Sequence, residues 1–243
     1  MKRILTTLKE KWPEYLLEIL VITIGILGAF ALNNWNENRK QGASAMANLS
    51  ILKQNLVDDR SEILSLLNNV NSTLESADSL LGQFKMIIPI DERTTYHINK
   101  LILEYNFSPN TNGLKILNAK GDLAYFDNTL QADIMKYYSL VENIIEREGI
   151  TNQFIKDKYE IHYFNHYSFT INSTNQLLAV ANYYTDDLRK IQKINESDLR
   201  ADRKLEGLAF GRRYQCITQK QAYENAIIHL DLLISKVENR LTN

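Results

Sequence analysis

The chain has 243 residues, a formal net charge of −1 at pH 7 and 44% hydrophobic residues, with only three prolines and nine glycines. This balance, with no cluster of Lys and Arg interleaved with aromatic residues, argues against nucleic acid as a partner. The scarcity of proline and glycine predicts an all-α protein, and the single cysteine, Cys216, excludes an intramolecular disulfide.

An apolar segment close to the N-terminus is long enough for a membrane helix. Residues 19–32 form an unbroken, uncharged and almost wholly apolar run, which residues 15–17 extend on its N-terminal side. The combined stretch approaches the roughly 20 residues that a helix needs to cross the hydrocarbon core of a bilayer. Trp12 and Trp35 bracket it about 34 Å apart along a helix, which suits two aromatic belts. We therefore predict a transmembrane helix over residues 15–35, with Tyr15 at its start.

The charges beside the span predict its orientation. Basic residues are denser before it than after it, the nearest being Lys2, Arg3, Lys9 and Lys11 on one side and Arg39 and Lys40 on the other. This bias favours a cytoplasmic N-terminus. For a bacterial chain we thus expect a short cytoplasmic tail at residues 1–14, a single pass through the inner (cytoplasmic) membrane, and residues 36–243 in the periplasm.

A cleaved signal peptide is the alternative interpretation of the same segment. Ala29-Phe30-Ala31 has the A-x-A pattern that signal peptidase recognises. However, the apolar run continues to Leu32 and then into helix-compatible polar residues. An uncleaved signal anchor is therefore the preferred prediction.

Two features inside the span are candidates for function. Glu18 is its ionisable residue, and a carboxylate in a membrane must be protonated, paired or close to water. Glu18 lies about 9 Å along the helix from Trp12, so it either reaches the cytoplasmic headgroups, pairs within an oligomer, or relays protons. Gly25, Gly28 and Ala29 include a G-x-x-x-A spacing, which lets two membrane helices approach closely but is also frequent by chance.

A heptad pattern follows the span. Apolar residues recur at every seventh position, at Leu49, Leu56, Ile63, Val70, Ala77 and Phe84. Leu52, Leu66 and Leu80 supply the alternate seam position, which Asp59 and Thr73 interrupt. We predict one helix from about Pro13 to Phe84, whose part at about 43–84 carries this stripe either as an intramolecular core or as a self-association surface, as in a coiled coil.

The remaining residues predict a helical bundle over about 91–241. After a connection at Pro89, Asp91 or Thr94 is a candidate cap for a helix that ends before Pro109 and turns Ile98, Leu101, Ile102 and Tyr105 inward. A short helix over residues 114–119 follows, with Gly121 as its left-handed C-terminal residue. Asp127 then caps a helix over residues 129–147 that ends at Gly149, with inward residues Leu130, Ile134, Tyr137, Tyr138, Val141 and Ile145.

Two further helices complete the predicted bundle. One spans about 151–194 and is aromatic in its first half and aliphatic around Leu177, Leu178 and Val180. The last spans about 214–241, with inward residues Ala222, Ala226, Leu230, Leu233 and Val237. No element is predicted for the charged residues between them.

Residues with catalytic or metal-binding chemistry are sparse. His162 and His166 are four residues apart on a predicted helix, so both imidazoles share one face and could bind a metal with Glu160 nearby. The surrounding tyrosines and phenylalanines instead favour an aromatic packing face, and no third ligand is fixed. No phosphate loop, nucleophile elbow, H-E-x-x-H or C-x-x-C occurs, so we expect neither an enzyme nor a cofactor.

Two segments resemble an uncharacterised family of single-pass membrane proteins from Bacteroidota, a domain of unknown function. In residues 15–40, Glu18, residues 24–27 (IGIL) and residues 33–37 (NNWNE) are similar to that family's V-x-I-G-I-L core and N-N-W-N-E exit. Residues 113–138 resemble its second pattern of a short helix, a glycine and a paired tyrosine. The chain departs from the family in its Ala-Lys-Gly turn and in the small residues at 28–31. The resemblance implies the same topology and a helical periplasmic domain, and it implies no activity.

These observations predict a bitopic inner-membrane protein that acts as a non-enzymatic assembly or scaffold component. Its expected partners are the lipid bilayer and either further copies of the chain or other membrane and periplasmic proteins, because long heptad-bearing helices create interfaces. The alternatives are a periplasmic sensor and a proton-coupled, stator-like subunit that uses Glu18.

Overall fold

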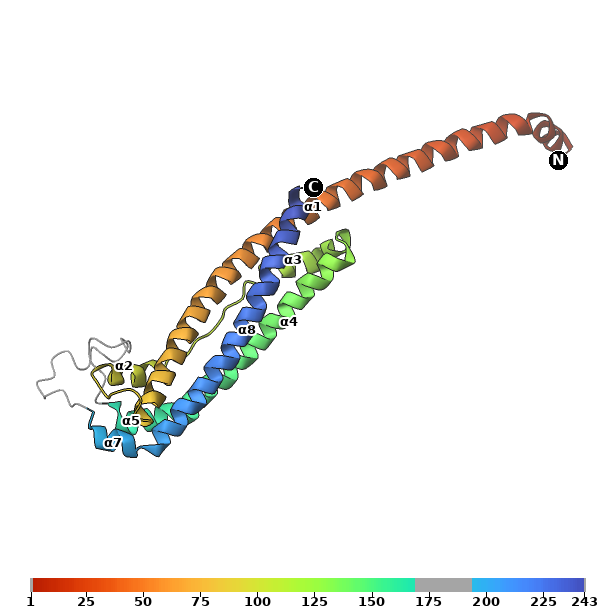
Figure 1. Cartoon of the computed structure of the whole chain (residues 1–243). Coiled ribbons are helices and arrows are strands. Elements are labelled where there is room, and N and C mark those ends of the chain that lie inside the picture. Colours follow the sequence, from red (N-terminus) through yellow and green to blue (C-terminus); the bar gives the residue numbers. More distant parts are fainter. Residues whose placement is uncertain (1, 169–193, 243) are drawn as a thin grey trace, which may run out of the picture.

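The computed structural model describes residues 2–168 and 194–242, which form helices and loops with no strand among them. The predicted all-α fold is confirmed. Three long helices, α1 (Lys2–Phe84), α4 (Asn128–Phe154) and α8 (Arg203–Thr242), form a bundle in which α8 packs against both others. The N-terminal part of α1 projects from one end of this bundle, near the C-terminus of the chain (Figure 1). We call this the anchor end, and the opposite end the far end.

The first helix follows the prediction at its C-terminus and departs from it at its N-terminus. α1 ends at Phe84 as expected, and it runs through Gly42 without a break. It begins well before Pro13, which lies inside the helix rather than at its start. Beyond Phe84 the chain turns through Met86, a non-glycine residue with a left-handed φ of 61°, whose N–H donates to the carbonyl of Gln83 at 3.1 Å.

The segment after α1 is less helical than the sequence predicts. α2 (Arg93–Lys100) is short; a turn at residues 101–102 follows it, and residues 103–111 form neither helix nor strand. All four residues expected to face inward are nevertheless buried, namely Ile98, Leu101, Ile102 and Tyr105. The Asp91 side chain accepts a hydrogen bond from the N–H of Arg93 at 2.9 Å, as a capping residue would.

The two turn residues predicted around the middle of the chain are confirmed. α3 (Asn112–Lys120) ends at Gly121, whose φ of 69° is left-handed. A single 3₁₀ turn, η1 (Asp122–Tyr125), leads to Asp127, whose side chain accepts from the N–H of Leu130 at 2.9 Å and so caps α4. Both residues act through local geometry, which is why the sequence alone locates them.

The prediction that Gly149 ends its helix is wrong. α4 continues to Phe154 and leads through a π-helical segment, η2 (Ile155–Glu160), into α5 (Ile161–His166). A glycine costs a helix only about 1 kcal/mol, and the burial of Glu148, Thr151 and Ile155 around it outweighs that cost. On the same helix Ile144 is buried in place of Ile145, which is 46% exposed.

The described residues after 194 contain more helix than predicted. The predicted positions Leu177, Leu178 and Val180 lie outside the described residues. The charged residues after 194 form α7 (Glu196–Ala201) and the start of α8, which begins eleven residues before the predicted position 214. The inward residues predicted for this helix are confirmed as buried, namely Ala222, Ala226, Leu230, Leu233 and Val237.

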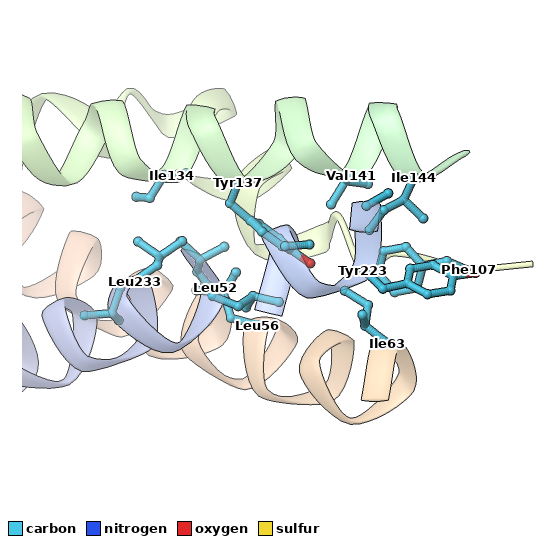
Figure 2. Close-up of a cluster of buried hydrophobic side chains, with 14 of the residues drawn as sticks. Leu52, Leu56, Ile63, Phe107, Ile134, Tyr137, Val141, Ile144, Tyr223 and Leu233 are labelled. Atoms are coloured by element: carbon cyan, nitrogen blue, oxygen red, sulfur yellow. The ribbon is translucent and has the colours of Figure 1, made fainter. Parts of the chain in front are cut away.

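The heptad stripe lies in the core of the bundle. Figure 2 shows Leu56 and Ile63 of α1 facing Tyr223 and Leu233 of α8, with Tyr137 of α4 closing the same cluster. All six stripe residues are buried within the single chain, namely Leu49, Leu56, Ile63, Val70, Ala77 and Phe84. Of the two interpretations, the structure therefore supports the intramolecular core. The prediction of a self-association surface along this stripe is corrected, because α8 and α4 already cover it.

Candidate functional site

The apolar segment of α1 lies outside the bundle. It is the one stretch in the described residues that is long and apolar enough to cross a membrane, and none of it is buried within the protein. Its side chains are exposed; for example, the exposed fraction is 64% for Leu17 and 68% for Leu32. Hiding such side chains from water is worth about 1.5–3 kcal/mol each, so their joint exposure would cost on the order of 15 kcal/mol. The segment is therefore no core helix of the bundle, and it is compatible with a single membrane pass.

The residues that the sequence singled out around the span share this exposed part of α1. All have exposed side chains or, for the glycines, exposed backbone, namely Trp12, Tyr15, Glu18, Gly25, Gly28, Ala29 and Trp35. A Cβ added at Gly25 or Gly28 would meet no atom within 4 Å, so this face is open to lipid or to another helix. At the end of the span the guanidinium of Arg39 lies 5.4 Å from the centre of the Trp35 ring, which is cation–π geometry.

A second feature is buried inside the bundle. Residues 101–111, which we call the connector, begin with a turn at residues 101–102 and then run to α3 beside the long helices without forming helix or strand (Figure 1). Tyr105 and Phe107 of this connector are buried. A segment that forms neither helix nor strand has no regular partners for its backbone N–H and C=O groups. Side chains of the surrounding helices bind these groups instead.

Acceptors on α1 and α4 bind the N–H groups of the connector and of the first turn of α3. The N–H of Phe107 donates to Glu148 Oε2 at 2.9 Å. The other three bonds run from Ser108 N–H to Glu62 Oε1 at 3.0 Å, from Asn110 N–H to Asp59 Oδ1 at 2.8 Å, and from Gly113 N–H to Asn55 Oδ1 at 2.7 Å. α1 and α4 are thus joined through the connector that lies between them.

Donors on α8 and α4 bind the carbonyl groups of the connector. The Arg212 guanidinium, which is fully buried, donates to the carbonyl of Leu101 at 3.2 Å and to that of Leu103 at 2.9 Å. The Asn152 amide donates to the carbonyl of Tyr105 at 3.2 Å. We call these side chains together the polar seam: Asn55, Asp59, Glu62, Glu148, Asn152 and Arg212.

Two carboxylates of the polar seam are also bound by tyrosines. The Tyr223 hydroxyl donates to Glu148 Oε1 at 2.5 Å, and the Tyr137 hydroxyl donates to Asp59 Oδ2 at 2.7 Å. Burial raises the pKa of both carboxyl groups, and the hydrogen bonds that each one accepts only partly oppose this effect. Glu148 is 4% and Asp59 is 1% exposed, so neither is within reach of a substrate in solution. Their hydrogen bonds join the helices to the connector.

The histidine pair lies at the far end. His162 Nε2 is 2.7 Å from Asp202 Oδ2, the Tyr167 hydroxyl donates to the same oxygen at 2.8 Å, and the ring centres of His162 and His166 are 4.5 Å apart. Burial raises the pKa of Asp202, but hydrogen bonds from Leu205 N–H, Tyr167 and His162 outweigh it, so the net pKa is lowered. No group of three or more His, Cys, Asp or Glu side chains with metal-binding geometry occurs among the described residues.

The aromatic side chains around this pair are tightly packed. Tyr159 and Tyr163, on the same stretch of chain as the histidines, are almost completely buried, which agrees with the predicted aromatic packing face. Asp202 also accepts from the N–H of Leu205 at 2.9 Å and so caps the first turn of α8. Cys216 is likewise buried, and burial raises the pKa of its thiol.

The sequence does not predict the polar seam as a unit, although it carries part of the signal. Asp59 and Thr73 interrupt the heptad at positions that face the core, and both are buried with hydrogen-bond partners, Thr73 with Tyr105 at 2.8 Å. A polar residue at such a position implies a specific partner. Glu148 and Arg212 carry no comparable signal, because their partners are backbone groups of a distant segment.

Comparison with protein-family models, with curated proteins and with solved structures finds no match for this chain.

Proposed function

We propose that the chain is a bitopic inner-membrane protein, with its N-terminus in the cytoplasm and its bundle in the periplasm, that acts as a non-enzymatic scaffold or assembly component. The observation that carries this proposal is the continuity of α1. One helix contains both the exposed apolar segment and the heptad stripe at the core of the bundle. The topology is also the one implied by the resemblance to the Bacteroidota single-pass proteins, with which we group the chain.

A continuous helix makes the bundle a rigid extension of the membrane anchor. From Trp35 to Phe84, α1 covers about 70 Å at 1.5 Å per residue. The part of α1 that lies in the bundle is held by α8 and α4 through the core and through the polar seam. The far end of the bundle is thus kept at a fixed height and orientation relative to the anchor, which suits a protein that positions partners.

Self-association in this proposal resides in the membrane segment rather than in the heptad stripe. The stripe is covered by the chain itself, whereas Gly25, Gly28 and Ala29 form an exposed small-residue face. Close packing of two such helices brings their backbones into van der Waals contact. The chain then forms a homo-oligomer through this face or enters a larger membrane complex.

The topology is tested by fractionation and reporter fusions. We expect the chain to resist alkaline carbonate extraction, and a C-terminal reporter that is active only outside the cytoplasm to be active. Recovery of the intact chain in the soluble fraction, or a C-terminus in the cytoplasm, would refute the bitopic proposal.

The assembly role is tested by native mass measurement in mild detergent and by identification of co-purifying proteins. We expect an oligomer or a complex that a Gly25→Ile and Gly28→Ile double substitution weakens, because branched side chains separate the helices. Gly42→Ile is the matched control, since it also places a side chain where no atom lies within 4 Å, but outside the span. A wild-type chain that stays monomeric and retains no other protein would contradict scaffolding.

A further inference from the structure

Helix α8 carries apolar side chains on two opposite faces. One face is buried in the bundle and includes Cys216, Tyr223 and Leu230. A second set of residues lies on the opposite side of the helix, since successive residues are about 100° apart around its axis. We call this second face the outer stripe, and it consists of Gly207, Phe210, Tyr214, Ile217, Gln221, Asn225, Ile228, Leu232 and Ser235.

The large apolar side chains of the outer stripe are exposed. The exposed fraction is 64% for Phe210, 58% for Tyr214, 63% for Ile228 and 60% for Leu232. Phe210, Gln221 and Leu232 follow each other at intervals of 11 residues, which is close to three helical turns. The stripe therefore runs almost straight along α8 for about 33 Å. Exposed apolar side chains aligned in this way mark an interaction surface.

The outer stripe has no charged residue, and charges along its border are engaged within the chain. Three ion pairs lie along this border: Arg213 with Asp78, Lys220 with Glu224, and Asp231 with Arg60. A strongly charged partner would therefore find no charge to bind on the stripe itself. Contact between two identical surfaces is compatible with this composition, because it brings no like charges together.

The two polar residues in the middle of the stripe suit contact with a second copy of the chain. Gln221 and Asn225 carry amide groups, which both donate and accept hydrogen bonds. Each amide can therefore bind the same amide of another copy, whereas a carboxylate or an ammonium group would repel its counterpart. A single asparagine in the seam of a parallel coiled coil fixes the register of the two helices in this way.

The area of the stripe is sufficient for a dimer of membrane-anchored chains. A large apolar side chain that is about 60% exposed has about 100 Å² still to bury. The four such side chains contribute about 800 Å² over two copies, and Ile217, Gln221 and Asn225 raise the total to about 1,200 Å². This area is at the lower limit for stable interfaces, and anchors in one bilayer raise the effective concentration of the two bundles.

We propose that the outer stripe of α8 is the contact surface for a second copy of the chain, with the two α8 helices parallel and side by side. The inference rests on the proposed membrane topology and self-association, because copies anchored in one membrane hold their bundles in the same direction. A two-fold axis along the bundle then places each stripe residue against the same residue of the partner. This contact and the one in the membrane segment strengthen each other.

Disulfide cross-linking of the full chain in its membrane, with copper phenanthroline as the oxidant, tests the parallel contact. Gln221→Cys places a thiol at the centre of the stripe, where the parallel contact brings the two Cα atoms within the limit of about 7 Å for a disulfide. Ser139→Cys is the control, because it places a thiol on an exposed position of α4. Wild type, whose Cys216 is buried, gives the background.

We expect Gln221→Cys to form a linked dimer at least about tenfold faster than Ser139→Cys, because the contact raises the local concentration of the second thiol. Equal rates for the two variants would overturn the proposal.

Charged substitutions identify the surface that makes the contact. Ile228→Glu sets two like charges against each other in the dimer, so it should reduce cross-linking through Gln221→Cys to the rate of Ser139→Cys. Ile145→Glu is the control, because it makes the same change at an exposed isoleucine of α4, and it should leave the fast rate unchanged. Loss of the fast rate in both variants, or its retention in both, would contradict the proposal.

Failure of this inference and failure of the proposed function give different results. A chain recovered in the soluble fraction contradicts the membrane anchor itself. A chain that forms an oligomer in native mass measurement, but shows no fast cross-linking through Gln221→Cys, contradicts only the contact at α8. If Ile228→Glu releases another protein and leaves the oligomer intact, a different partner covers the stripe, and the contact between copies at α8 is likewise refuted.

Discussion

Replacement of Glu148 by alanine is the sharpest test of the polar seam. Glu148 is 4% exposed and accepts from the Phe107 N–H at 2.9 Å and from the Tyr223 hydroxyl at 2.5 Å. Alanine removes both acceptors and leaves two buried donors without a partner. Glutamine keeps a carbonyl oxygen for Phe107 and offers its amide to the tyrosine oxygen, so it preserves the geometry without the charge.

The expected magnitude follows from these two bonds. A buried donor left without a partner costs about 1–3 kcal/mol, so Glu148→Ala should destabilise the bundle by about 4 kcal/mol. For a domain of this size that corresponds to a melting temperature lower by about 10 °C. Glu148→Gln should destabilise by only about 1–2 kcal/mol, because its oxygen still accepts from Phe107 and only the Tyr223 hydroxyl loses its acceptor.

Thermal unfolding of the full chain in mild detergent, followed by circular dichroism, measures the difference between these variants. Hydrogen exchange at the Phe107 amide locates the effect, since this amide should exchange faster in the alanine variant. Glu142→Ala is the control, because it removes an exposed glutamate from the same helix. Equal melting temperatures for Glu148→Ala and Glu142→Ala would refute the idea that buried hydrogen bonds to the connector hold the bundle together.

Three further predictions concern pH and backbone geometry. Burial raises the pKa of Glu148 in the folded protein. The unfolding free energy of the wild type should therefore increase relative to that of Glu148→Gln as the pH falls from above this raised pKa towards the ordinary value of 4.5. Parallel curves of unfolding free energy against pH for the two proteins would contradict this prediction. Gly113→Ala should destabilise the bundle by about 3 kcal/mol in urea unfolding, because the added Cβ would lie 2.6 Å from the backbone of Leu52. Gly149→Ala should instead stabilise it by up to about 1 kcal/mol, because the added Cβ would have no atom within 4 Å. Stability changes of the same sign for both variants would be inconsistent with the packing. Met86→Gly should stabilise the bundle by about 0.5 kcal/mol in the same assay. The variant relieves about 1–2 kcal/mol of strain from the left-handed backbone, which outweighs the added entropy of the unfolded chain. A destabilised variant would show that Met86 makes a compensating contact.

Several features of the fold are readable from short stretches of sequence. The end of α1 at Phe84, the left-handed Gly121 and the Asp127 cap all depend on residues within a few positions of each other. Helical periodicity also identifies the buried faces of α1 and α8. It fails at Gly149, where a weak local signal for a helix end is overridden by the burial of the residues around it.

The two candidate sites also differ in how far the sequence reveals them. The exposed apolar segment is visible in the sequence, because the length and composition of one helix suffice to describe it. The polar seam is not, because Glu148 and Arg212 bind backbone groups of residues 101–107, which are distant in the sequence. Only the path of the connector between α2 and α3 brings those groups together.

The sequence by itself determined that this protein is helical and carries one segment suited to a membrane, since both properties arise from interactions along a single helix. Only the tertiary structure decided which helices cover the heptad stripe. The period of an apolar stripe specifies that a partner helix exists, but not whether it belongs to the same chain. Here α8 and α4 of the same chain bury Leu56 and Ile63, so the partner helices of the stripe belong to the chain itself.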